Sequence, residues 1–342
     1  MYCWWRVIYR TRNWFAYLVL FAAVFGGASV PSFFNLYGDI SATTKNLWRC
    51  QTNFLISLPF VFHTIRSQPE SIDFRYIATF EGILPLLMSG IVFSLGSSTF
   101  IASAWLTISS HALIFSALAG VFIILARMSM WQEVHNLEKY GTLAVIIGCV
   151  FLMSDKYAQK ANGQKASKLG DFLAIFTSVW YAMFFPLNKA IMQHIPGVMI
   201  YMWNSVTSGF WFILYTLFIQ GISMSDFISR DPQVGLFGWI SSEQWMICVF
   251  LVAPIWGFCC NGGYILSWKY FEPQILGNAL LLEPMIGQSL GWLLGQDKIP
   301  GTLTLVGSVI ILSGISFIIR GSSESLKLKA VSSESDQEIP IL

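Results

Sequence analysis

The sequence predicts an all-α membrane protein with ten transmembrane helices in two inverted five-helix repeats. Three observations lead to this prediction. Hydrophobic residues make up 55% of the 342-residue chain, charged residues make up 11%, and the mean hydropathy is +0.61. Apolar runs of about 20 residues, the length of a helix that crosses a bilayer, recur along the chain. The two halves also share short sequence patterns at a nearly constant offset, which indicates an internal repeat.

The composition also narrows the function. A net charge of +2, without any basic run that contains interleaved aromatic residues, argues against nucleic-acid binding. The six cysteines are scattered, with no CxxC pair and no histidine at zinc-ligand spacing. We interpret them as small hydrophobic residues and expect no metal or other cofactor. Because the chain also lacks a GxxxxGK phosphate loop and an HExxH motif, we expect that it is not an enzyme.

Ten apolar runs can be assigned as spanning helices. The first run is too long for a removed signal peptide and should remain in the mature protein. The third and fourth are separated only by LTISSH, so nine or eleven spans are also compatible with the sequence. Longer polar breaks follow the second, fifth and seventh runs, and their Pro, Gly, Ser and charged residues place them in water. The runs lie near residues 14–34, 47–65, 80–103, 108–127, 138–154, 170–190, 198–220, 244–268, 274–294 and 302–320.

The internal repeat divides the chain into two halves. SAWLTISSHALIFSALAG aligns with LSWKYFEPQILGNALLLE at an offset of 163, and GTLAVIIG at 141–148 aligns with GSVIILSG at 307–314 at an offset of 166. We expect a first repeat at 1–154, a lysine-rich linker at 155–169, a second repeat at 170–320 and a disordered cytosolic tail at 321–342. An odd number of spans per repeat places the second copy in the opposite sense across the membrane, as in inverted-repeat carriers.

Three segments carry a resemblance to a known family. These are GDFLAIFTSVWYAMFFPLNKAI, LLLEPMIGQSLGWLLGQDKIPGTLTLVGSVIILSGI and ALIFSALAGVFIILARMSMWQEVHNLEKYGTLAVIIGCVFL. The chain, except for its tail, resembles the drug/metabolite transporter superfamily, specifically its EamA-type members. The resemblance implies a ten-helix carrier for a small metabolite, and it leaves the substrate open among amino acids, sugars, nucleosides, nucleotide sugars and others. The matching residues are Glu283, Pro284, Asp297, Gly307 and Gly314 in the second repeat and Glu133, Gly141 and Gly148 in the first, where the proline is absent.

Polar residues within the apolar runs are the candidates for a substrate site. Asn261 and Tyr264 follow Gly257 at helical spacing and should share one face of the eighth span. Ser98 occupies the position that corresponds to Asn261 in the first repeat. An aromatic and apolar wall with a few hydrogen-bonding groups suits a small-molecule pocket. The predicted substrate-binding residues are Ser98, Tyr181, Asn188, Asn261, Tyr264 and Glu283.

Glu283 is an acid inside the ninth apolar run. A bare carboxylate at the centre of a bilayer costs at least ~2.5 kcal/mol, so Glu283 should face the interior of the bundle. There it is either a structural acid bonded to a neighbouring helix or a substrate or proton site. Pro284 should leave the carbonyl of Leu280 without its helical donor and loosen the helix beside the acid.

The expected function is transport of a small organic metabolite by alternating access, with proton coupling or exchange as possible modes. The alternative is a non-transporting membrane scaffold or receptor of the same fold. The expected partners are the lipid bilayer and the metabolite, in a plasma membrane or an endomembrane. Basic residues flanking the first span place both termini in the cytosol. The sequence leaves the oligomeric state open, and a homodimer is compatible with it.

Overall fold

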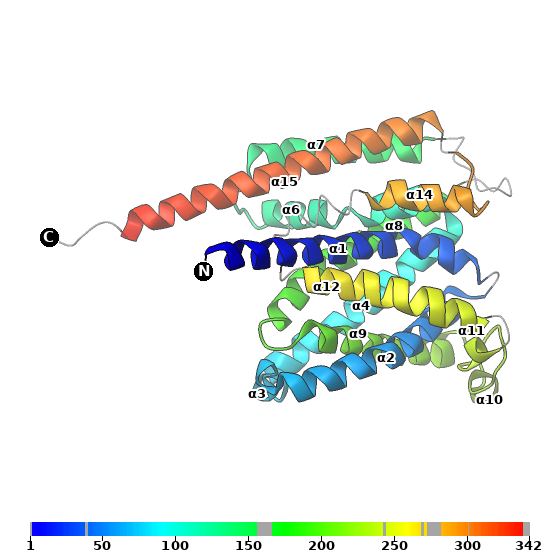
Figure 1. Cartoon of the computed structure of the whole chain (residues 1–342). Helices are drawn as coiled ribbons and strands as arrows, with labels where there is room; N and C mark the ends of the chain where they lie inside the picture. The colour runs from blue at the N-terminus through cyan, green and yellow to red at the C-terminus, as the bar shows by residue number, and fades with distance from the viewer. Residues whose placement is uncertain are drawn as a thin grey trace.

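The computed structural model describes residues 2–37, 40–155, 166–241, 244–267, 270–271, 282–299 and 301–337, and in these ranges every long element is helical (Figure 1). The first half contains α1 (Tyr2–Asn35), α2 (Ala42–Ser67), α3 (Phe74–Ile77), α4 (Phe80–Leu106), α5 (Ser109–Ser116), α6 (Ala119–Ser129) and α7 (Asn136–Met153). The second half contains α8 (Lys168–Ile191), α9 (Gly197–Leu214), the π-helix η2 (Tyr215–Ile219), α10 (Met224–Phe227), α11 (Gln244–Met246), the π-helix η4 (Ile247–Gly262), α12 (Gly263–Ser267), α14 (Glu283–Leu293) and α15 (Thr302–Gln337).

Seven helical segments of the described chain are long and apolar enough to cross a membrane, which confirms the expectation of an all-α membrane protein. They are 14–35, 80–106, 109–129, 136–153, 168–191, 244–267 and 302–321. The three other predicted runs coincide with α2, with α9 and η2, and with α14. α2 is less apolar because Lys45, Arg49 and Asn53 lie along it, and part of the run near 274–294 lies outside the described residues.

The surface and interior of the bundle have the polarity of a protein in lipid. Large apolar side chains are exposed on the outside, among them Phe21 at 66%, Val150 at 60% and Val309 at 63%. Inside, many polar side chains are buried, and most of them hydrogen-bond to neighbouring helices or to their own backbone. A bilayer makes this distribution favourable, because apolar side chains on the outside meet lipid and buried polar groups need partners.

The helices pack in pairs that join the two halves of the chain. α1 packs against η4, and α4 packs against α8. α2 packs against α9, α5 against α14, and α7 against α15, which lie side by side in Figure 1. The N-terminal end of α1 and the C-terminal end of α15 point toward the same end of the bundle (Figure 1).

Four glycines allow α7 and α15 to approach each other closely. A Cβ built on Gly314 would lie 2.6 Å from the carbonyl oxygen of Gly141, and one built on Gly307 would lie 2.7 Å from that of Gly148. Both distances are too short for a real side chain, so only glycine permits this contact. Small residues that let helix backbones meet are typical of helix pairs in membranes.

The expectation of a disordered tail at 321–342 is wrong for residues 321–337, because α15 continues to Gln337. Extending an existing helix is much easier than nucleating a new one. After Gly321 the sequence contains no glycine, and its next proline is Pro340, so nothing breaks the helix at the end of the last apolar run. Residues 338–342 lie outside the described residues.

Candidate functional site

A polar stripe on α2 faces the interior of the bundle. Lys45, Arg49, Asn53 and Ser57 recur every four residues, which keeps them on one slowly winding side of the helix, and each is at most 2% exposed. The sequence analysis passed over Arg49 because it stands at the edge of the predicted second span. The recurrence of polar residues every four positions is the signal that would have found it.

The Arg49 side chain lies between aromatic rings. Its guanidinium carbon is 4.3 Å from the centroid of Trp256 and 5.0 Å from that of Phe93, within the range at which ring faces attract a cation. Its Nη2 donates to Ser97 Oγ at 3.3 Å. These neighbours come from α4 and η4, so both halves of the chain hold the guanidinium.

Arg49 retains unused hydrogen-bond donors. It is fully buried. Among the described residues, its Nε and Nη1 have no hydrogen-bond partner, and no carboxylate lies within ion-pair distance. Removing a guanidinium from water costs several kcal/mol even after the protein relaxes. The contacts with the aromatic rings offset about 2 kcal/mol of this desolvation cost. Arg49 is therefore a buried cation whose charge is only partly compensated by described residues.

Asn53 and Tyr201 extend this cluster with further unsatisfied groups. Both side chains are at most 2% exposed, and within the described part of the chain neither the Asn53 amide atoms nor the Tyr201 hydroxyl has a hydrogen-bond partner. Both groups face Gly257: a Cβ there would overlap Asn53 Oδ1 and would lie 2.6 Å from Tyr201 Oη. Buried polar groups are nearly always bonded, so two unsatisfied side chains beside an unpaired arginine require an explanation.

The π-helix η4 explains why the eighth span differs from its prediction. Its hydrogen bonds run from i to i+5, and Pro254, which cannot donate a backbone bond, lies inside it. Gly257 and Tyr264 therefore meet different neighbours, and Asn261 turns back so that its Nδ2 donates to Trp256 O at 3.3 Å. The prediction placed Gly257, Asn261 and Tyr264 on one wall by α-helical spacing, whereas in the π-helix the Asn261 amide bonds to the backbone of its own helix.

Glu283 is buried and hydrogen-bonded to Tyr264. The Tyr264 hydroxyl donates to Glu283 Oε1, and a Cβ on Gly27 of α1 would overlap the same oxygen. α14 begins at Glu283, with Pro284 in its first turn, where a proline loses no helical bond. The expected loss of a helical donor for the Leu280 carbonyl stays a prediction, because Leu280 lies outside the described residues. The N-terminal end of a helix also favours a carboxylate.

Tyr181 and Cys260 connect the two charged positions. Each is close enough to interact electrostatically with both Arg49 and Glu283. The Tyr181 ring packs beside Gly96, where a Cβ would lie 3.1 Å from the ring. The structure thus brings three predicted residues, Tyr181, Tyr264 and Glu283, into one neighbourhood with Arg49.

Asn188 lies in a separate cluster whose members bond to one another. Its Oδ1 accepts hydrogen bonds from Ser89 Oγ and from Asn204 Nδ2, each at 3.4 Å, and its Nδ2 donates to Phe184 O at 2.8 Å. Ser89 Oγ also donates to Asn204 Oδ1 at 2.5 Å. These bonds join α4, α8 and α9. Asn188 thus has the environment of a structural residue.

Ser98 is also outside the Arg49 cluster. Its hydroxyl donates to Ser94 O at 2.8 Å, one turn earlier in α4. The adjacent Ser97 faces Arg49 instead. The repeat alignment therefore led to a position one residue away from the serine that contacts the arginine.

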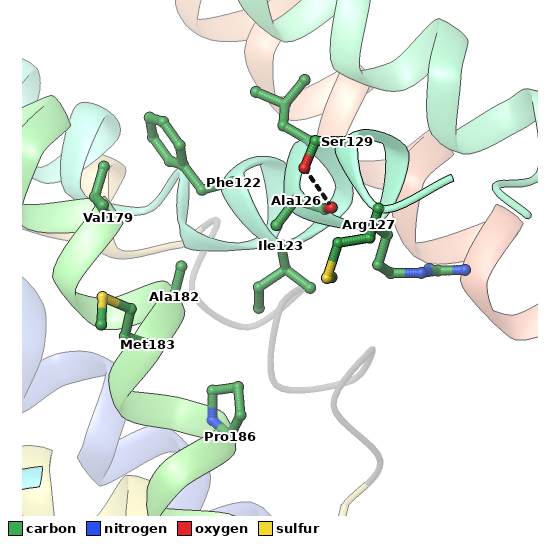
Figure 2. A pocket seen from close by; sticks show the side chains of 11 residues that line it. Phe122, Ile123, Ala126, Arg127, Ser129, Val179, Ala182, Met183 and Pro186 are labelled. Atoms are coloured by element: carbon green, nitrogen blue, oxygen red, sulfur yellow. Dashed lines mark hydrogen bonds between the residues drawn. The ribbon is translucent and has the colours of Figure 1, made fainter. Parts of the chain in front are cut away.

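A cavity of about 530 Å³ lies elsewhere, between α6 and α8 (Figure 2). Its walls are mainly apolar, with Phe122, Ile123 and Ala126 on one side and Val179, Ala182, Met183 and Pro186 on the other. Its charged member, Arg127, is engaged by Glu138 Oε1 at 3.1 Å and by Glu133 O at 2.8 Å. None of the six predicted residues lines this cavity. Its lining suits an acyl chain better than a polar solute.

A third polar cluster joins α5, α8 and α15. His111 Nδ1 lies 3.0 Å from Asp171 Oδ1, which also accepts a 2.6 Å hydrogen bond from Thr107, and His111 Nε2 lies 3.3 Å from Thr304 Oγ1. The order hydroxyl, histidine, acid is that of a nucleophilic triad. However, the Thr304 hydroxyl donates to Asp155 Oδ2 at 2.7 Å, which engages its proton. The cluster is better described as a clamp between helices.

The segment GQSLG at 287–291 fits the GxSxG formula of a hydrolase, a match that sequence analysis overlooked. A nucleophile elbow requires a sharp turn between a strand and a helix. Here the segment lies inside α14, and Ser289 Oγ donates to Met285 O at 2.8 Å. The local structure therefore gives this serine no activated hydroxyl.

Comparison with known proteins gives the fold only. No protein-family model and no curated protein matches this sequence. A solved protein described only as "Crystal structure of protein" superposes with a TM-score of 0.58 at 12% sequence identity, over 89% of this chain and 96% of that chain. At this identity the match shows a shared fold over nearly the whole length and carries no information on activity.

Proposed function

We propose that this protein is a membrane carrier that moves a small organic metabolite by alternating access between two inverted five-helix repeats. In this proposal the ten spans are α1, α2, α4, α5 with α6, and α7, followed by α8, α9, η4 with α12, α14 and α15. The family resemblance in the sequence favours this assignment. The protein acts as a transporter and not as an enzyme.

The pairing of the helices supports the repeat. In the proposed repeat, α1 corresponds to α8, and α4 corresponds to η4 with α12. A contact between α1 and η4 therefore requires an equivalent contact between α8 and α4, and the structure has both. The structure also has three contacts between helices that correspond to each other in the two repeats. These are α2–α9, α5–α14 and α7–α15. The glycine contacts follow the same rule, because the offset of 166 relates Gly141 to Gly307 and Gly148 to Gly314.

The observation that carries the proposal is the unsatisfied cluster of Arg49, Asn53 and Tyr201 between the repeats. Polar residues in a scaffold should satisfy one another, as Ser89, Asn188 and Asn204 do. In the cluster around Arg49, donors and acceptors from both halves have no partner among the described residues. Substrates of inverted-repeat carriers bind where the repeats meet, and a solute with polar groups would satisfy these atoms.

Two further features belong to the proposal. The protein resides in a plasma membrane or an endomembrane, with both termini in the cytosol. Glu283, hydrogen-bonded by Tyr264 and electrostatically linked to the Arg49 neighbourhood through Tyr181, is the residue that would bind a proton during the cycle. Exchange of one solute for another is the alternative mode of coupling.

Uptake by reconstituted vesicles tests the function. The purified full chain is placed in liposomes, which are incubated with a defined mixture of small carboxylates, phosphate esters, polyols, nucleosides and amines. Mass spectrometry of the vesicle contents then identifies the solutes that entered. Saturable accumulation above protein-free liposomes is expected, and contents identical to those of protein-free liposomes would refute transport of these classes and favour the scaffold or receptor alternative.

A further inference from the structure

We infer that Arg49 binds the anionic group of the transported solute, so the substrate is a small organic acid whose carboxylate or phosphate is recognised between the two repeats. This inference rests on the proposed transport function and specifies its substrate class.

The first argument is charge. Arg49 carries a guanidinium group and is 0% exposed, yet no described carboxylate forms an ion pair with it. By contrast, Arg127 of the same chain, which is partly exposed, pairs with Glu138. Buried charges in proteins are normally paired, so the missing partner of Arg49 is expected to be an anion that arrives from outside the chain.

The second argument is geometry. The rings of Trp256 and Phe93 lie 4.3 and 5.0 Å from the guanidinium carbon, and Nη2 is held by Ser97 at 3.3 Å. These contacts fix the guanidinium group before a ligand arrives. The N–H of Nε and both N–H groups of Nη1 have no acceptor in the described ranges and can donate to a ligand. A guanidinium with several free donors matches the oxygens of a carboxylate or a phosphate better than any neutral group does.

The third argument is the set of neutral groups nearby. The Asn53 amide and the Tyr201 hydroxyl bond to no described residue and converge on Gly257, in the π-helix that also supplies Trp256. An amide and a hydroxyl can bond the hydroxyl, amide or carbonyl groups of an organic solute. A bare inorganic anion would leave most of them unsatisfied, so the cluster fits an organic acid with further polar groups.

Glu283 limits which acids fit. It lies in the same electrostatic neighbourhood, since Tyr181 and Cys260 each interact with both Arg49 and Glu283. An acid bound at Arg49 therefore has a second ionisable group of the protein near it. A solute that carries one anionic group is favoured over one with anionic groups at both ends, because only one described cation of this cluster is without an ion-pair partner.

The test compares Arg49→Gln, Arg49→Lys and Lys189→Gln in the vesicle assay with the same defined mixture. Lys189→Gln is the charge-matched control, because Lys189 is exposed near the end of α8. The expected result is uptake of carboxylates or phosphate esters by the natural protein and by Lys189→Gln, at least a tenfold loss in Arg49→Gln, and partial uptake by Arg49→Lys. Each variant is also checked for an unchanged melting profile, and Arg49→Lys keeps the test valid if Arg49→Gln fails to fold.

The outcomes separate the two proposals. Uptake of carboxylates and uptake of phosphate esters are measured separately. The class whose uptake depends on Arg49 identifies the anionic group that Arg49 binds. If only polyols, nucleosides or amines enter the vesicles, transport stands and the inference is wrong. Anion uptake that persists in a folded Arg49→Gln protein also overturns the inference. If no solute enters, the proposed function itself fails.

Discussion

Gly314 of α15 packs so closely on Gly141 of α7 that a Cβ on Gly314 would lie 2.6 Å from the Gly141 carbonyl oxygen. The reverse also holds, since a Cβ on Gly141 would overlap the Gly314 carbonyl oxygen. Two backbones that approach so closely cannot move apart to accept a methyl group without losing the contacts along the whole helix pair.

Gly314→Ala should therefore destabilise the protein by about 1–3 kcal/mol, the usual cost of overpacking a tight contact. Gly120→Ala is the control, because no atom lies within 4 Å of a Cβ at that position in α6. It should be neutral or stabilising by up to about 1 kcal/mol, since alanine favours a helix. The measurement is the melting temperature of each purified variant in detergent. Equal melting temperatures for the two variants would contradict the α7–α15 contact.

A second glycine pair tests the site. Gly257→Ala places a methyl group onto Asn53 Oδ1 and near Tyr201 Oη, so it should reduce uptake by at least tenfold. Gly262 lies in the same π-helix, and no atom of another described element lies within 4 Å of a Cβ built there, so Gly262→Ala should leave uptake unchanged. Initial uptake rates in vesicles with matched protein content measure the difference. Normal uptake by Gly257→Ala would show that the Asn53 and Tyr201 groups do not contact the solute.

The class of fold could be predicted from composition and from the length of the apolar runs, since lipid demands both. The site could be predicted only in part. Glu283 interrupts an apolar run and was predicted for that reason, whereas Tyr181 and Tyr264 were predicted from their helical spacing to Asn188 and Asn261. Arg49 was missed because it stands at the edge of the predicted second span, 47–65, where basic residues usually reach the interface. The direction of Asn261 could not be predicted, because the periodicity of a π-helix is not visible in an apolar sequence.

Arg49 also gives a prediction about stability. A buried, incompletely paired charge is costly, so Arg49→Met should fold with a melting temperature equal to or above that of the natural protein, although it loses the bond to Ser97. A residue kept for binding can destabilise the fold that carries it. Thermal unfolding in detergent, compared with uptake by the same variant, distinguishes the roles. A melting temperature several degrees lower would show that Arg49 serves mainly to hold the helices together.

Outside the spans, Asp73 gives a prediction about pH. The Tyr76 backbone N–H donates to Asp73 Oδ1 at 3.0 Å, and His194 Nδ1 lies 3.4 Å from Asp73 Oδ2. The hydrogen bond from Tyr76 lowers the pKa of Asp73 below its usual 3.8, and the interaction with His194 lowers it to a smaller extent. A lowered folded-state pKa means that the stabilisation is fully present above pH 3.8 and is lost as pH falls through the folded pKa.

Asp73→Asn should accordingly be less stable than the natural protein at neutral pH, and the difference should shrink below about pH 3.8. Because Asp73 is solvent-exposed, the difference should be small. Melting temperatures of the two proteins across the acidic range measure it. A difference that grows as the pH falls would contradict the assigned bond to Tyr76.

Glu283 gives the prediction that decides how transport is coupled. Its carboxyl group faces Tyr264 of α12, Cys260 of η4 and Tyr181 of α8, and it has no ion-pair partner among the described residues. Glu283→Gln keeps an oxygen that can accept the Tyr264 hydrogen bond but cannot bind or release a proton. If a proton moves with the solute, this variant should fold normally and should transport at a rate that no longer depends on pH.

Tyr264→Phe is the companion variant, because it removes the hydrogen bond and leaves the carboxyl group able to titrate. It should retain a pH dependence, shifted from that of the natural protein. Uptake driven by an imposed pH gradient, measured for the natural protein and both variants, tests the scheme. A folded Glu283→Gln protein with the natural pH profile would exclude Glu283 from proton coupling. Glu283 would then be a structural acid that contributes to the fold through its hydrogen bond with Tyr264.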